Sequence, residues 1–231
     1  MIAGPLVMVH SPLVGAMTWQ PVAEILRSQG HDVRVPSLAA AVSGRGPYYT
    51  KIAKAVSEVA EGKPLVTLVV HSGAGSLVPV IAQRMQKACP YPLWSVVFVD
   101  AQLPIPKPRS AAPDAWVEGL RGLAVDGILP RWDQWFPPGA FESLIPEPAM
   151  RAAFIANCPN LPFAYFEERP PMRLSWVPQS VAYIRLSAMY DAHLQEARAN
   201  RWRAIKADLD HLAPLTRPAE VAALITQALT A

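Results

Sequence analysis

The sequence has few charged residues, few cysteines and no long uninterrupted run of apolar residues. Charged residues make up 17% of the 231 positions, and 21 Lys and Arg against 18 Asp and Glu leave a formal net charge of only +3. The basic residues form no dense cluster, which argues against nucleic acid as a partner. No apolar run reaches the roughly 18 residues that a membrane-spanning helix requires. We therefore expect neither nucleic acid nor a membrane as a partner.

Metal-binding and targeting patterns are also missing from the sequence. Cys89 and Cys158 are not spaced as metal ligands, and neither an H-E-x-x-H pattern nor a glycine-rich phosphate loop occurs, so we expect no metal and no cofactor. The N-terminal stretch has no basic segment of the kind that opens a signal peptide, and two cysteines are typical of free thiols in a reducing compartment. We expect a cytoplasmic protein that binds a small molecule, with the choice between monomer and dimer left open.

Proline, in contrast, is abundant, and its distribution divides the chain. Of the 25 prolines, 14 lie within residues 104–178, together with four of the seven tryptophans. The division predicts one α/β core built from residues 1–103 and 179–231, with a helical insertion at residues 104–178 that forms a lid. The many large aromatic residues argue against a disordered linker and favour an apolar pocket beneath the lid. The aromatic residues expected to shape this pocket are Trp132, Trp135, Phe166 and Trp176.

The parts on either side of the insertion alternate between short apolar segments and amphipathic ones. Uniformly apolar strands that alternate with helices are typical of a parallel sheet covered on both faces. The expected strands are residues 5–10, 31–36, 65–70, 94–99, 181–186 and 204–207, and the expected helices are residues 19–28, 49–59, 73–88, 192–200 and 218–229.

The most informative stretch joins the third strand to the helix that follows it. Residues 65–78 read LVTLVVHSGAGSLV, an apolar strand followed by a turn of small residues with Ser72 at its tip. This pattern is typical of a nucleophile elbow, in which a strained turn exposes the serine hydroxyl. The pattern departs from G-x-S-x-G because its two small positions are Val70 and Ala74. Taken alone, the stretch is equally compatible with a strand–helix junction in which Ser72 caps the helix.

An acidic residue and a histidine follow later strands of the expected sheet. Asp191 follows the fifth strand and His211 follows the last, so that Ser72, Asp191 and His211 each stand at the C-terminal end of a strand. Open α/β sheets place their sites at that edge. Asp100, after the fourth strand, is the alternative acid, and Asp191 is also compatible with a role as the N-cap of the helix at residues 192–200.

With these residues the chain resembles the α/β-hydrolase superfamily. It is similar to the group of plant-type esterases, hydroxynitrile lyases and actinobacterial hydrolases of secondary metabolism. The resemblance covers residues 5–104 and 180–230, and it implies an α/β-hydrolase fold of about six mostly parallel strands with helices on both faces and a helical lid. The matching segments read VHSPLVGAMTWQPVAEILRSQGHDVRVPSL, VVHSGAG, FVDAQLP and DHLAPLTRPAEVAALI.

The resemblance also implies a Ser–His–Asp catalytic triad. Ser72 would attack an acyl carbon, and His211 would accept the serine proton and return it to the leaving group. Asp191 is favoured over Asp100 as the acid that orients His211. The backbone N–H of Gly73 would donate to the oxyanion.

The first loop departs from the pattern that the resemblance implies. The second oxyanion donor of the superfamily is the amide two residues after the first-loop histidine, and this position is Pro12, which has no N–H. The substitutes within reach are the Leu13 N–H and the Ser11 hydroxyl. Pro12 therefore indicates either a reshaped oxyanion hole or a reaction that does not need a complete one.

The sequence as a whole predicts a serine hydrolase that acts on a small, largely apolar acyl ester. The alternative is a lyase or cyclase of natural-product biosynthesis that uses the same residues, for example to eliminate an acyl group such as acetate; Pro12 favours this alternative. A third hypothesis is a non-catalytic ligand-binding protein, suggested by Val70 and Pro12 together. The sequence does not define the substrate.

Overall fold

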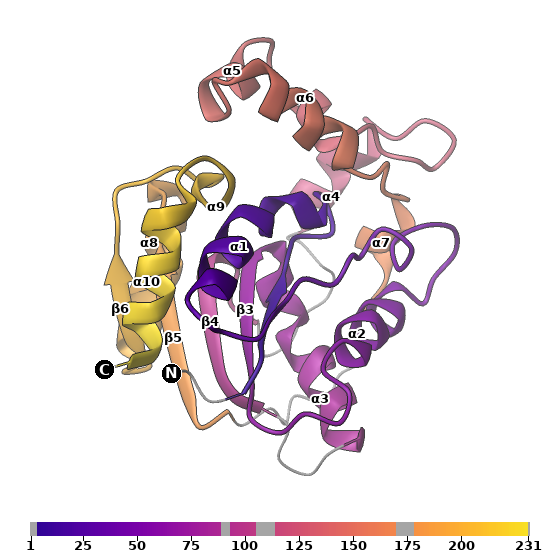
Figure 1. The fold of residues 1–231 in the computed structure, drawn as a ribbon. Helices are drawn as coiled ribbons and strands as arrows, with labels where there is room; N and C mark the ends of the chain where they lie inside the picture. Colours follow the sequence, from indigo (N-terminus) through magenta and orange to yellow (C-terminus); the bar gives the residue numbers. More distant parts are fainter. Residues whose placement is uncertain (1–3, 89–92, 105–113, 170–177, 231) are drawn as a thin grey trace.

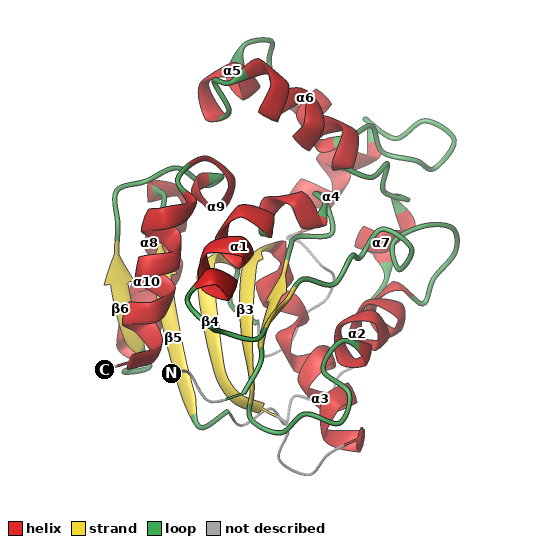
Figure 2. Ribbon diagram, in the orientation of Figure 1, coloured by secondary structure: helices red, strands yellow, loops and turns green. Residues whose placement is uncertain are grey.

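A six-stranded parallel sheet forms the centre of the computed structural model, which describes residues 4–88, 93–104, 114–169 and 178–230 (Figures 1 and 2). The strand order is β2-β1-β3-β4-β5-β6, and every neighbouring pair is parallel. All six expected strands are present, although the second is only two residues long. The strands are β1 (Leu6–Val9), β2 (Val33–Arg34), β3 (Val66–Ser72), β4 (Leu93–Ala101), β5 (Ser180–Arg185) and β6 (Arg203–Lys206).

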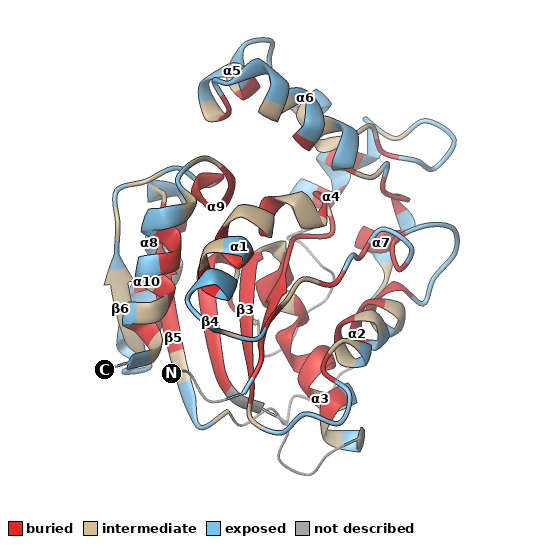
Figure 3. Ribbon diagram, in the orientation of Figure 1, coloured by how far each residue is buried: buried red, intermediate tan, exposed pale blue. Residues whose placement is uncertain are grey.

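Helices cover both faces of the sheet, as expected for parallel strands that are largely apolar. One face packs against α1 and α10, and the other packs against α2, α3 and α8. Burial is concentrated in the strands and in the helix faces turned toward them (Figure 3). The helices of the core are η1 (Ala16–Thr18), α1 (Gln20–Ser28), α2 (Tyr48–Glu58), η2 (Gly73–Leu77), α3 (Val78–Ala88), η4 (Ala188–Tyr190), α8 (Asp191–Ala199), α9 (Ala213–Thr216) and α10 (Pro218–Thr230).

The alternation of side chains along β3 shows how the two faces are filled. Leu68 and Val70 pack in the cluster that holds α2 and α3, whereas Val69, between them, packs in the cluster that holds α1 and α10. Successive strand residues point to opposite faces, so a strand that is buried on both sides is apolar at most of its positions. All three side chains are fully buried.

The segment between β4 and β5 is called the insertion here, and its described residues form short helices and loops beyond the C-terminal edge of the sheet (Figure 1). Side chains of the insertion accept hydrogen bonds from the core: the Asn157 amide oxygen accepts from Met17 N at 3.0 Å, and the Glu168 carboxylate accepts from the Tyr48 and Tyr49 amides that begin α2. The division into two core halves and a lid stays a prediction. The described helices of the insertion are α4 (Asp114–Arg121), η3 (Trp132–Trp135), α5 (Ala140–Leu144), α6 (Pro148–Asn157) and α7 (Ala164–Glu167).

Within the described residues, no helix combines the length and the apolar character needed to cross a membrane.

Candidate active site

Ser72 lies at the end of β3 in a backbone conformation that side chains rarely adopt. Its φ is 57° and its ψ is −130°, and the chain turns there into η2 and then α3. Its side chain makes no capping hydrogen bond, so the interpretation as a simple helix cap is wrong. Gly75 is required in the turn, since a Cβ at this position would lie 2.0 Å from the Gln102 carbonyl oxygen. The strained serine turn is therefore present even though Val70 occupies a position that is usually small.

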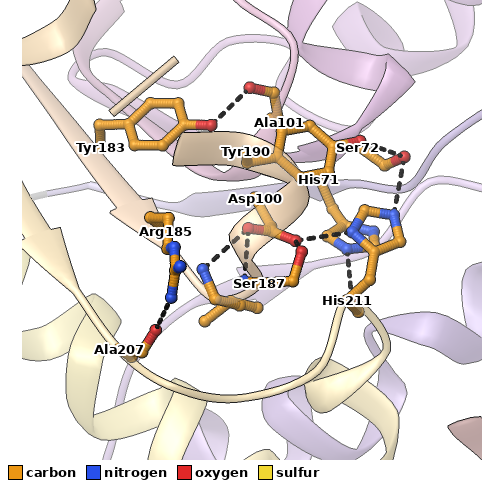
Figure 4. Close-up of polar contacts among 11 residues, drawn as sticks. His71, Ser72, Asp100, Ala101, Tyr183, Arg185, Ser187, Tyr190, Ala207 and His211 are labelled. Atoms are coloured by element: carbon orange, nitrogen blue, oxygen red, sulfur yellow. Dashed lines mark hydrogen bonds and ion pairs between the residues drawn. The ribbon is translucent and has the colours of Figure 1, made fainter. Parts of the chain in front are cut away.

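Ser72, His211 and Asp100 form a continuous chain of hydrogen bonds (Figure 4). The Ser72 Oγ lies 3.0 Å from His211 Nε2, and His211 Nδ1 lies 2.8 Å from Asp100 Oδ2. A carboxylate accepts only, so Nδ1 carries the proton of the neutral ring, and Nε2 accepts from the serine hydroxyl. This arrangement prepares the serine oxygen to lose its proton to His211.

Asp100 reaches His211 because β4 is irregular at this residue. Val99 pairs with His71 and Ala101 pairs with Ser72, which leaves Asp100 as an extra residue, and its φ is 43°. A bulge of this kind redirects a side chain at the end of a strand. The Asp100 carboxylate is fully buried and accepts from Leu186 N at 2.8 Å, from Ser187 N at 2.9 Å and from Ser187 Oγ at 2.6 Å.

These contacts keep the buried carboxylate charged. Burial acts to raise the pKa of Asp100, but the hydrogen bonds from His211 and Ser187 outweigh it and hold this pKa below its usual value. The negative charge in turn favours the proton on His211 Nδ1, and it is placed to stabilise the imidazolium that would form if Ser72 lost its proton to this ring.

Asp191, the acid favoured from the sequence, does not contact His211. It is the first residue of α8, and its carboxylate accepts from Arg185 Nε at 2.6 Å. The buried Arg185 guanidinium also donates to Asp208 Oδ1 at 2.9 Å and to the Ala207 carbonyl at 2.8 Å. The structure therefore corrects the preference for Asp191: it is Asp100, the alternative, that lies against His211.

Two aromatic rings enclose the imidazole of His211. The His71 ring stacks on it at 4.5 Å between centroids and the Tyr190 ring at 5.1 Å. His71 Nε2 donates to the His211 carbonyl oxygen at 2.9 Å. Burial, followed by the proximity of His211, lowers the pKa of His71 to about 3, so this residue is a neutral support.

The sequence reasoning missed Tyr190 and Ser187 as members of the site. Both belong to the turn that follows β5. The one sequence signal that could have indicated them is this position at the C-terminal edge of the sheet.

The first loop lies beside the serine turn. His10 Nδ1 donates to the Ser11 carbonyl at 2.8 Å and its Nε2 accepts from Leu38 N at 3.2 Å, which holds the loop in place. The Ser11 Oγ lies 3.2 Å from the point where a Cβ on Gly73 would stand. It accepts from Leu13 N at 3.3 Å. The structure thus brings Ser11, Leu13 and Gly73 to one side of Ser72, with Pro12 between them.

A cavity of about 580 Å³ opens above Ser72 and His211. The insertion supplies most of its aromatic wall, including the expected Trp132, Trp135 and Phe166, whereas Trp176 lies outside the described residues. No Asp, Glu, Lys or Arg stands among the described residues that line it. Nor does the described part of the chain gather three or more His, Cys, Asp or Glu in a way that could hold a metal ion. The other lining aromatic residues are Trp116, Phe136, Tyr165 and Tyr190.

Sequence comparisons give one partial relative. Methyl jasmonate esterase 1 from Vitis vinifera is 32% identical over 109 residues, which are 43% of this chain and 40% of that esterase. The chain thus matches less than half the length of this curated relative. No family model matches the sequence.

Structural comparisons extend over nearly the whole chain. An extracellular α/β-hydrolase from a Paenibacillus species, described as a structural and functional homologue of tobacco salicylic acid binding protein 2, superposes with a TM-score of 0.74 at 20% identity, covering 98% of this chain and 99% of its own. A variant of polyneuridine aldehyde esterase superposes with a TM-score of 0.66 at 16% identity, covering 96% and 98%. The chain therefore has the α/β-hydrolase fold, which confirms the fold expected from the sequence.

Proposed function

We propose that this protein is a serine hydrolase that cleaves small, largely apolar carboxylic esters through an acyl-enzyme on Ser72. The observation that carries the proposal is the hydrogen-bond chain from Ser72 through His211 to Asp100 at the floor of an apolar cavity. The partial relative and the structural neighbours that are named as esterases support it.

In the proposed reaction Ser72 Oγ attacks the acyl carbon while its proton passes to His211 Nε2. Asp100 holds the Nδ1 proton and stabilises the imidazolium. His211 then protonates the departing alcohol, and a water that His211 deprotonates attacks the acyl-enzyme and releases the acid.

The oxyanion hole is proposed to use the Gly73 N–H and the Ser11 hydroxyl. Pro12 offers no N–H, and the Leu13 N–H already donates to Ser11 Oγ. In that bond the Ser11 hydroxyl oxygen is the acceptor, so the proton of the Ser11 hydroxyl remains free to bond to a ligand. Ser11 thereby takes the place of the amide lost at Pro12.

The substrate class follows from the wall of the cavity. Tryptophan and phenylalanine rings bind apolar groups, and the described part of the lining, which contains no Asp, Glu, Lys or Arg, offers no partner for a charged substrate. We propose that the insertion acts as a lid and that it binds the acyl group of a neutral ester.

The proposal is tested by labelling Ser72 with a fluorophosphonate and by measuring hydrolysis of p-nitrophenyl esters of increasing acyl length. The folded protein should be labelled at Ser72 and should turn over these esters, and Ser72→Ala should lose both properties. Turnover that persists in folded Ser72→Ala contradicts the proposal. A folded protein that binds esters without labelling or turnover contradicts it as well and favours the non-catalytic alternative.

The lyase alternative rests on Pro12, which lines the cavity without an N–H to offer to an oxyanion. Turnover of the natural ester in ¹⁸O-labelled water separates the two reactions. Hydrolysis through an acyl-enzyme places ¹⁸O in the released acid, whereas elimination of a carboxylate leaves both of its oxygens unlabelled.

A further inference from the structure

Tyr190 touches the reacting oxygen from the side opposite the first loop. Its hydroxyl lies 3.4 Å from Ser72 Oγ, its ring lies parallel to the His211 ring with an interplanar angle of 5°, and the residue is 8% exposed (Figure 4). In the sheet, β1 leads into Ser11 on one side of β3, and β4 and β5 lie on the other side. Tyr190 follows β5, so the oxyanion donors and this phenol approach Ser72 from different directions.

The direction of the Tyr190–Ser72 hydrogen bond follows from counting protons. Asp100 holds the His211 proton on Nδ1, so His211 Nε2 accepts, and the single proton of Ser72 points to Nε2. Ser72 then has no proton left for Tyr190, and the phenol must be the donor. Burial raises the pKa of Tyr190 to about 12, so the phenol keeps its proton at neutral pH.

Resting on the function proposed above, we infer that Tyr190 is a catalytic residue whose hydroxyl stabilises Ser72 Oγ as the leaving group when the acyl-enzyme breaks down. In this step water has added to the acyl carbon after giving a proton to His211. The bond between the acyl carbon and Oγ then breaks, its electron pair goes to Oγ, and Oγ takes the proton from His211 Nε2. Tyr190 keeps its own proton throughout and donates a hydrogen bond to the charge that develops on Oγ.

The same hydrogen bond acts in the first half of the reaction. Attack of Oγ on the ester is the reverse of its departure from the tetrahedral intermediate, so Oγ carries the same developing charge in both steps. Loss of the hydroxyl should therefore slow both acylation and deacylation. A purely structural role, in which the ring supports His211, would be kept by phenylalanine and would leave both rates unchanged.

The test compares Tyr190→Phe with the unsubstituted protein and with Tyr183→Phe. Phenylalanine keeps the ring against His211 and removes only the hydroxyl, while Tyr183 is a second buried phenol whose hydroxyl donates to the Ala101 carbonyl at 2.8 Å. Acyl-enzyme is formed with one equivalent of p-nitrophenyl acetate; the release of p-nitrophenol gives the acylation rate, and the decay of the acylated mass in rapid-quench samples gives the deacylation rate.

In Tyr190→Phe the acyl-enzyme should both form and decay about tenfold more slowly, which corresponds to one hydrogen bond to a charged group. Tyr183→Phe should change neither rate. An unchanged urea unfolding midpoint shows that the Tyr190→Phe variant is folded. Formation and decay of the acyl-enzyme at the unsubstituted rates overturn the role of Tyr190. An unsubstituted protein that never acquires the acetyl mass contradicts the proposed function itself.

Discussion

The carboxylate of Asp100 receives hydrogen bonds from two backbone amides, from the Ser187 hydroxyl and from His211. At the scale of single residues, these bonds hold the carboxylate charged and fix the His211 tautomer. Asp191, in contrast, is half-exposed and shares Arg185 with Asp208. Neutralising Asp100 should therefore impair His211, whereas neutralising Asp191 should leave His211 unaffected.

Asp100→Asn should lower kcat for a p-nitrophenyl ester by roughly 10³- to 10⁴-fold, because an amide in place of the carboxylate no longer fixes the tautomer or stabilises the imidazolium. Asp191→Asn is the matched control and should keep kcat within about twofold, since Arg185 retains its bonds to Asp208 and Ala207. Steady-state kinetics of both variants checks the prediction. A loss in Asp191→Asn as large as in Asp100→Asn would contradict the assignment of the acid.

Ser11→Ala should lower kcat/KM by about 10²-fold, because it removes one of the two proposed oxyanion donors. Ser37→Ala, an exposed serine after β2, should have no effect. The measurement is the initial rate on a p-nitrophenyl ester at low substrate concentration. Full activity in Ser11→Ala would indicate that the Leu13 amide, rather than the Ser11 hydroxyl, is the second oxyanion donor.

At the scale of elements, the insertion is joined to the core at the start of α2. Pro47 precedes this helix and provides no side-chain cap. Glu168, just after α7, supplies the acceptor instead: its carboxylate lies 2.7 Å from Tyr48 N and 3.0 Å from Tyr49 N. Since α7 also carries Tyr165 and Phe166 into the cavity wall, this cap connects the stability of α2 to the shape of the pocket.

Glu168→Ala should lower the free energy of unfolding by about 1–2 kcal/mol, as expected when a helix loses its N-terminal acceptor. It should also raise KM for long-chain esters more than for an acetate, because α7 loses an attachment. Glu167→Ala provides the control, since that neighbouring side chain is about half-exposed and loses an ion pair with Arg121 but no helix cap. Urea denaturation and ester kinetics measure the two effects, and equal destabilisation by both variants would argue against the cap.

At the scale of the whole molecule, folding buries two histidines in their neutral form. Burial lowers the pKa of His10 to about 4 and that of His71 to about 3, against 6.5 for an exposed histidine. Between these values the unfolded chain binds protons that the folded chain does not. Stability must therefore fall as the pH falls from about 6.5 toward 4.

The free energy of unfolding should fall by on the order of 3 kcal/mol between pH 6.5 and pH 5. Asp100 acts with the same sign, but only below its usual pKa of 3.8, outside this window. His10→Gln should reduce the fall by somewhat less than half, because His71 remains and burial also lowers the pKa of the partly buried His193. Urea titrations at several pH values measure the slope, and a flat profile would show that the two rings do not stay neutral on folding.

Local patterns in the sequence were sufficient for the elements of the fold. Runs such as residues 65–70 are apolar at every position except Thr67, as is typical of a strand that is buried on both faces. The serine turn, the position of His211 after the last strand and the aromatic insertion are equally visible, since each depends on residues close together in the chain. For this reason the parallel sheet and the α/β-hydrolase fold were predictable.

The partner of His211 was decided only by tertiary structure. Asp100 and Asp191 both follow strands, and no local pattern distinguishes them. The choice depends on one extra residue in β4, which turns Asp100 toward His211, and on the buried Arg185, which holds Asp191 away. The contact between Tyr190 and Ser72 also depends on tertiary packing, because the two residues follow different strands. Strand register, bulges and contacts between distant side chains arise from packing among many residues at once, and a single stretch of sequence carries no record of them.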